Sequence, residues 1–150
     1  MVNVIKKYMP ILAIFSLLTF SNIIYLQSAS AAPATYTVNV TSDEIDANIG
    51  DGICETANAG ECTLRAAIEE ANSNSDIDTI EFNIAGSGAH VIQPTSDLPE
   101  IYEQTIVDGY TNNSGATPNS AISPAPIDSV INIGIDMSNA DAGLFVSGDI

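Results

Sequence analysis

The sequence predicts an all-β fold built from stacked coils, a β-solenoid, with a short helix near its start. Three observations predict it. From Asp78 onward, apolar residues alternate with polar ones, which is the period-two pattern of strands. Ile80, Ile106 and Ile131 lie 26 and 25 residues apart, and Gly, Asn and Asp turns fill the intervals. Repeats of that length can stack over one core, although an antiparallel sandwich would also have short strands and frequent turns.

The N-terminal residues 1–31 have the three-part order of a secretory signal peptide. Two lysines precede the apolar run Ile11–Phe20, and small residues at Ala29 and Ala31 suit a signal peptidase. Polar residues interrupt this run, which argues against the alternative, a permanent membrane anchor. We therefore expect export, cleavage after Ala31 or Ala32, and no membrane insertion afterwards.

The charge of the remaining chain excludes several classes of partner. Without residues 1–31 the chain keeps one base, Arg65, against 19 Asp and Glu residues, which makes a net charge of −18. A single Arg cannot neutralise a phosphate backbone, so we expect no nucleic-acid partner. Attraction to anionic lipid is excluded for the same reason. We expect Arg65 to pair with Glu69 one helical turn further on, or with a loop carboxylate.

The elements can be followed from the start of the exported chain. Apolar and polar residues alternate between Tyr36 and Val40, which predicts a strand, and the polar residues 41–53 predict an acidic loop. Thr63 can then cap a helix that runs from Leu64 to Ala71, because its apolar residues recur at helical spacing and form one stripe. Two turns are not stable alone, so this helix must pack on something.

Residues 73–150 predict strands and turns only. Gly86 to Gly88 form a turn, and residues 111–126, rich in Asn, Ser, Gly and Pro, form a longer loop. Short strands are expected around 80–84, 91–92, 98–101, 106–108, 131–137 and from 144 onward.

The two cysteines, Cys54 and Cys62, are most simply one disulfide in an exported protein. Closing so short a loop would stabilise the fold by about 2–3 kcal/mol. Metal binding is the alternative, but a zinc site needs about four ligands and the only His is His90.

The acidic loop contains candidate calcium ligands. Asp43, Asp46, Asn48 and Asp51 lie close together in sequence and carry the hard oxygen ligands that calcium prefers. Their spacing differs from an EF-hand, because Gly50 occupies a ligand position and no Glu closes the loop. A solvated acidic loop is the other interpretation of the same residues.

Several stretches together resemble a known family, the CSLREA domain, which lies at the N-terminus of exported bacterial and archaeal surface proteins. The resemblance is carried by Thr35–Val40, Asp51–Cys54 and Cys62–Asn72. Later stretches look like the β-helix segments that usually follow this domain, namely Asp78–Gly88, Ile92–Thr95, Ile106–Thr111 and Ile135–Ala140. Ala66 stands where the family motif has Glu, so the reciprocal half of the helix capping box is missing.

The resemblance implies a right-handed parallel β-helix with an N-terminal capping strand and a short α-helix. Residues 35–72 would form the cap and residues 73–150 the first coils. The chain stops inside a coil without a polar cap, so we expect a truncated product or a fragment of a longer protein.

The expected function is that of a secreted or cell-surface structural or adhesive protein without catalytic activity in this segment. A polysaccharide lyase needs a base and cations, but Arg65 maps to the helix and no Lys follows it. One His, His90, flanked by turn residues, forms no Ser-His-Asp set. The alternative is the non-catalytic N-terminal part of a β-helix carbohydrate-active enzyme, a lyase or hydrolase. The expected ligand is a glycan or a surface protein, and calcium is the one candidate cofactor. Tyr102 and Tyr110 are candidate contacts, and the other interpretation is that they stack inside the coils or at coil corners.

Overall fold

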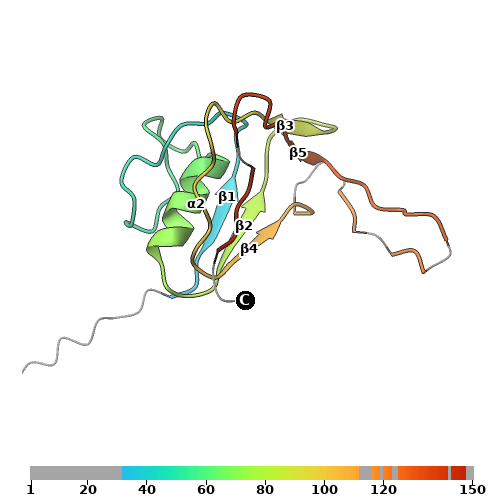
Figure 1. Ribbon diagram of the computed structural model, residues 1–150, viewed down its shortest axis with the longest axis horizontal. Helices are drawn as coiled ribbons and strands as arrows, with labels where there is room; N and C mark the ends of the chain where they lie inside the picture. The colour runs from blue at the N-terminus through green and yellow to red at the C-terminus, as the bar shows by residue number, and fades with distance from the viewer. Residues whose placement is uncertain (1–31, 112–115, 119, 123–124, 142, 148–150) are drawn as a thin grey trace, which may run out of the picture.

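The computed structural model describes residues 32–111, 116–118, 120–122, 125–141 and 143–147. The predicted signal peptide, residues 1–31, lies outside these ranges. Within them, no helix is both long and apolar enough to cross a bilayer. The described elements, in chain order, are β1 (Thr35–Val38), α2 (Leu64–Ser73), β2 (Asp78–Phe82), β3 (His90–Ile92), β4 (Thr105–Asp108) and β5 (Ile133–Ile135) (Figure 1).

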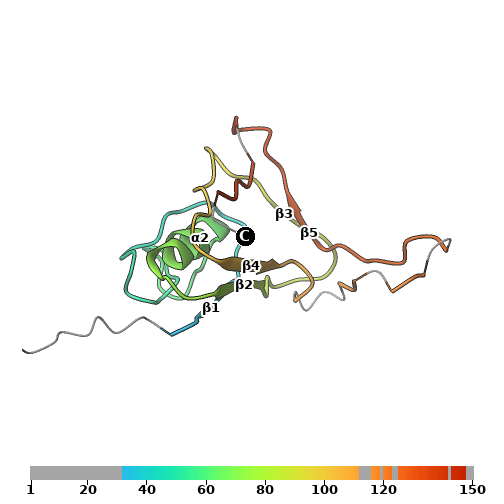
Figure 2. The same cartoon turned by 60° about the horizontal axis from the view of Figure 1, so that its bottom comes forward.

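The strands form two small parallel sheets. One sheet has the order β1-β2-β4, with β2 in the centre, and the other pairs β3 with β5. Ile80 of β2 lies opposite Tyr36 of β1 on one side and Val107 of β4 on the other. Figure 2 shows the three strands in this order, with β1 at the outer edge and β3 and β5 set apart from them.

The core lies between α2 and the three-stranded sheet. In β1 the alternation places Tyr36 and Val38 inside and both threonines outside, and β2 likewise buries Ile80 and Phe82. The helix contributes a stripe of apolar residues to the same core. Burial of each large aliphatic side chain stabilises the fold by about 1.5–3 kcal/mol. The buried cluster comprises Tyr36, Val38, Cys62, Leu64, Ala67, Ile68, Ala71, Ile80, Phe82, Ile84, Ile92, Leu98 and Ile101.

The helix begins at the predicted residue, Leu64, and ends two residues beyond the predicted Ala71. Thr63 is its N-cap, and the Thr63 hydroxyl accepts the backbone N–H of Ala66 at 3.0 Å. Asn72, beyond the predicted end, lies within the helix. Its side chain donates to the carbonyl of Glu100 at 2.7 Å and accepts the backbone N–H of Tyr102 at 3.1 Å. Asn72 therefore joins α2 to the segment before β4.

The predicted right-handed parallel β-helix is wrong. In the described ranges, the strands make two small parallel sheets beside one helix and do not stack into a solenoid. Ile80 is buried in β2, but Ile106 in the neighbouring β4 is 54% exposed and Ile131 is 67% exposed. Ile131 precedes β5, which pairs with β3 and not with β4. The regular spacing of the three isoleucines therefore reflects regularly placed turns and not a common core. The alternative, an antiparallel sandwich, is wrong as well, because both sheets are parallel.

Candidate functional site

Two adjacent acids on α2 hold the acidic loop, residues 41–53, against the helix. Glu70 is fully buried, and its two carboxylate oxygens accept the backbone N–H of Gly50 at 2.6 Å and of Gly52 at 2.9 Å. Glu69 accepts the N–H of Asp46 at 2.7 Å. Gly50 and Gly52 have φ angles of 92° and 82°, a region that favours glycine. The loop lacks regular secondary structure, and the helix carboxylates satisfy its backbone donors instead.

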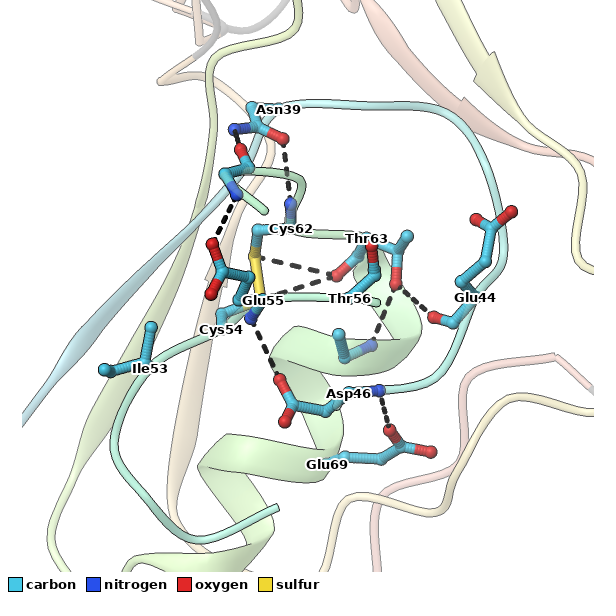
Figure 3. Close-up of a disulfide and its surroundings, with 12 residues drawn as sticks. Asn39, Glu44, Asp46, Ile53, Cys54, Glu55, Thr56, Cys62, Thr63 and Glu69 are labelled. Atoms are coloured by element: carbon cyan, nitrogen blue, oxygen red, sulfur yellow. Dashed lines mark hydrogen bonds between the residues drawn. A yellow bond between two sulfur atoms is a disulfide. The ribbon is translucent and has the colours of Figure 1, made fainter. Parts of the chain in front are cut away.

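Asp46 joins the acidic loop to the disulfide loop, residues 54–62. Its side chain is buried, and its two oxygens accept the N–H of Asn48 at 2.7 Å and of Glu55 at 3.0 Å. The N–H of Ala47 also donates to the Glu55 carbonyl at 2.8 Å. Figure 3 shows Asp46 between Glu55 and the helix residue Glu69. Asp46 therefore links three parts of the chain, the two loops through its carboxyl group and the helix through its backbone N–H.

The predicted disulfide between Cys54 and Cys62 is confirmed, with Cα atoms 5.2 Å apart. Asn39, at the end of β1, closes the disulfide loop from the other side (Figure 3). Its side chain donates to the Gly60 carbonyl at 2.8 Å and accepts the Cys62 N–H at 2.9 Å, and its own N–H donates to the Cys62 carbonyl. Glu55 accepts the N–H of Gly60. Covalent and hydrogen bonds thus hold the disulfide loop beside β1.

Arg65 is buried and saturated with acceptors. Its Nε and Nη2 each donate to one carboxylate oxygen of Asp43 at 3.0 Å, a bidentate pair. Its Nη1 donates to the carbonyl of Asp97 at 2.8 Å. Asp43 also accepts the backbone N–H of Thr95 at 2.7 Å and the hydroxyl of the same residue at 2.8 Å. Of the two predicted partners of Arg65, the loop carboxylate is the one bound, and it joins the helix to residues 95–97.

The environments of these carboxyl groups shift their pKa values in opposite directions. Burial raises the pKa of Glu69 and of Glu70 above the ordinary value of 4.5, and this outweighs the lowering effect of the backbone N–H groups that they bind. Burial also acts to raise the pKa of Asp43, but hydrogen bonds led by those from Arg65 hold it below 3.8. Burial, and then nearby acids, raise the pKa of Tyr36 to about 12.

The four predicted calcium ligands have other partners. Asp43 pairs with Arg65, Asp46 accepts backbone N–H groups, and Asp51 accepts an N–H within its own turn. Asn48 contacts Asp46 through its backbone N–H. Across the described part of the chain, no group of three or more Asp, Glu, His or Cys side chains is placed to hold a metal ion. Calcium would have to compete with these hydrogen bonds, and calcium binding by the loop stays a prediction.

The other candidate residues lie outside this region of the fold. His90 begins β3, and its backbone N–H donates to the Asn132 carbonyl at 2.8 Å in the two-stranded sheet. Tyr102 and Tyr110 are exposed, so neither ring is stacked inside a core. The two aromatic rings are accessible at the surface, whereas His90 contributes its backbone to the pairing of β3 with the β5 segment.

A groove of about 310 Å³ runs between β1 and the two loops. Ile53 is its largest exposed apolar residue, 60% exposed, and Figure 3 shows it apart from the hydrogen-bonded groups around the disulfide. Gly52 and Gly60 line it as well, and a Cβ atom at either position would meet nothing within 4 Å. We call it the β1 groove. Its lining residues are Thr35, Tyr36, Thr37, Asn39, Gly52, Ile53, Cys54, Gly60 and Cys62.

Neither Glu69 nor Glu70 is among the site residues that the sequence predicts. The indication lies in the helix pattern, because Glu70 is about 60° from the Ala67 edge of the apolar stripe and borders it. A second indication is the need of a glycine-containing loop for acceptors of its N–H groups. Both indications require the loop to be placed against the helix, which the sequence does not show.

Comparison with family models, with curated proteins and with solved structures finds no match for this chain.

Proposed function

We propose that the chain is exported and acts at the cell surface or outside the cell as a structural and adhesive protein, without catalysis in its described part. Residues 1–31 support export, because they have the order of a signal peptide. The Cys54–Cys62 disulfide fits an oxidising compartment. The resemblance of residues 35–72 to the CSLREA domain supports the same compartment.

The observation that carries this proposal is that the best-placed charged side chains are bound within the fold. Arg65 is held by Asp43 and a backbone carbonyl, and the carboxylates of Glu70 and Asp46 each accept two backbone N–H groups. General acid–base catalysis needs a titratable group that reaches the substrate. These groups are instead used to fix loops, which favours a structural role over an enzymatic one.

The described surface carries exposed apolar and aromatic side chains that favour binding. Ile53 and the two exposed tyrosines can each provide a contact to a ligand without a deep pocket. An acidic chain with exposed apolar groups favours neutral or basic ligands over polyanions.

A binding and cleavage screen tests the proposal. The secreted chain is applied to immobilised glycans and surface proteins, and separately incubated with pectin-like and neutral polysaccharides. We expect binding to at least one ligand and no released product. Product that is formed by the native chain but not by a heat-denatured sample would contradict the proposal, and so would the absence of binding to every glycan and protein.

A further inference from the structure

We propose that the outer edge of β1, with the β1 groove beside it, binds an extended peptide of a partner protein by strand addition, and that this peptide carries Lys or Arg. The inference rests on the proposed adhesive function and names the class of partner. It is carried by three observations: the direction of the backbone groups of β1, the shape of the groove, and the acidity of the chain around it.

The first observation concerns the backbone of β1. In a parallel ladder, successive residues direct their N–H and C=O groups alternately to the two sides of the strand. The carbonyls of Ala34 and Val38 accept N–H groups from the β2 side. Thr35 and Thr37 therefore direct their backbone groups away from β2, toward the outer edge, where no backbone partner for them is found among the described residues.

The same edge is already used once for a strand-like contact. Asn39 follows the alternation, and its N–H donates outward to the Cys62 carbonyl at 3.0 Å. The disulfide loop thus covers the edge at Asn39 and leaves Thr35 and Thr37 beside the groove. An added strand would continue this pattern with two residues' N–H and C=O groups, the main-chain contacts that β-strand addition uses.

The groove has room for the side chains of such a strand. Its volume of about 310 Å³ is sufficient for a short extended segment. Gly52 and Gly60 leave open space on its loop side, and the exposed Ile53 offers an apolar contact for alternate side chains of the peptide. The wall is held in place by the disulfide and by the Asn39 contacts, so little ordering is needed on binding.

The charge of the chain around the groove decides the kind of peptide. The lining residues are uncharged, but Asp51, Glu55 and Glu61 are chain neighbours of lining residues, and the exported chain has one base against 19 acids. A peptide with Lys or Arg complements this field, whereas a second copy of the chain, with the same net charge, is repelled. The occupant that we propose is therefore a basic extended segment of another protein.

The first experiment uses the native chain and synthetic peptides of about six residues that alternate Val and Thr and carry a Lys at each end. Binding is followed by NMR of the isotope-labelled protein. We expect shifts at Thr35, Thr37, Ile53 and Gly60. N-methylation of alternate peptide residues should weaken binding about tenfold in one register and leave it unchanged in the other, because only one set of N–H groups faces β1.

Three outcomes of the peptide experiment would overturn the inference. They are shifts confined to other surfaces, equal effects of both methylation registers, and equal binding of a matched peptide with Glu in place of Lys. These results leave the proposed function standing if the chain still binds a glycan or protein in the screen. Cleavage of a polysaccharide would contradict the proposed function whatever the peptides do.

A pair of protein variants provides the second experiment. Thr37→Pro removes an outward N–H from β1 without removing a ladder hydrogen bond to β2. Thr105→Pro is the matched control, because it makes the same change at an outward position of β4, on the opposite edge of the sheet. We expect Thr37→Pro to weaken peptide binding about tenfold and Thr105→Pro to leave it unchanged. A larger loss of affinity in Thr105→Pro than in Thr37→Pro, or equal losses in both variants, would overturn the inference. If a variant does not fold, the comparison of the two N-methylated peptides tests the inference instead.

Discussion

Asp43 accepts two hydrogen bonds from Arg65 and two from Thr95, and its side chain is only 6% exposed. It is the one loop carboxylate that neutralises the buried guanidinium. Removing one partner of a buried ion pair leaves the other charge in a medium that solvates it poorly. The single residue Asp43 therefore fixes the helix, the acidic loop and residues 95–97 together.

We predict that Asp43→Asn lowers the free energy of unfolding by about 3 kcal/mol, because the amide neither neutralises Arg65 nor accepts all four hydrogen bonds. Urea unfolding followed by circular dichroism measures this change. Asp141→Asn is the control, since Asp141 is exposed, and it should change the stability by less than about 0.5 kcal/mol. Equal stability of both variants would show that the buried pair contributes little.

At the residue scale, sequence reasoning succeeds where the signal is local. The disulfide follows from two cysteines behind a predicted signal peptide, and Thr63 precedes a helical stripe by one position. Glu70 is different, because it binds Gly50 and Gly52 from 20 and 18 residues away. Its role depends on the path of a loop that has no periodic pattern, so nothing in the sequence alone identifies it.

At the scale of elements, the helix is predicted well and the sheet is not. The start of α2 depends on its cap and its stripe, which are properties of neighbouring residues. In β2 apolar and polar residues alternate and every second side chain is buried. In β4 the apolar residues Ile106 and Val107 are adjacent, and both are exposed because β4 is an edge strand. Alternation shows that a segment is a strand but not which strand it pairs with. The β-helix prediction failed for this reason.

The cap of α2 offers a test at this scale. We predict that Thr63→Val lowers the free energy of unfolding by about 1–2 kcal/mol. Valine keeps the shape of the buried side chain but loses the hydrogen bond from the Ala66 N–H and the one to the Glu44 carbonyl. The same change at the exposed Thr41 is the control and should be nearly neutral. Chemical denaturation of both variants decides the matter, and a neutral Thr63→Val would contradict the assigned cap.

For the molecule as a whole, the net charge and the buried acids both make the folded state less stable as the pH rises from mildly acidic to neutral. The chain after residue 31 has one base against 19 acids, so its compact state is weakened by self-repulsion at neutral pH. Glu69 and Glu70 have raised pKa values in the folded state and therefore bind protons more readily there than in the unfolded chain. Mild acid favours folding through both effects.

We predict that stability increases as the pH falls from about 8 through the raised pKa values of Glu69 and Glu70 toward 4.5. Stability should decrease again below pH 3.8, because Asp43 becomes protonated as the pH falls through its lowered pKa and its pairing with Arg65 is lost. Melting temperatures of the chain without residues 1–31 across this pH range test the prediction. A midpoint that falls steadily from neutral to mildly acidic pH would contradict it.

The two acids of α2, Glu69 and Glu70, are structural and hold the acidic loop by its backbone N–H groups. Amide hydrogen exchange at Gly50 and Gly52, measured by NMR in the presence of a calcium chelator, tests this role. We predict slow exchange of both amides in the native chain, because Glu70 accepts both N–H groups inside the fold. The exchange should become fast in Glu70→Gln and stay slow in Glu100→Gln, whose side chain is exposed. Exchange at the rate of an unstructured peptide, or protection that appears only when calcium is added, would contradict the claim.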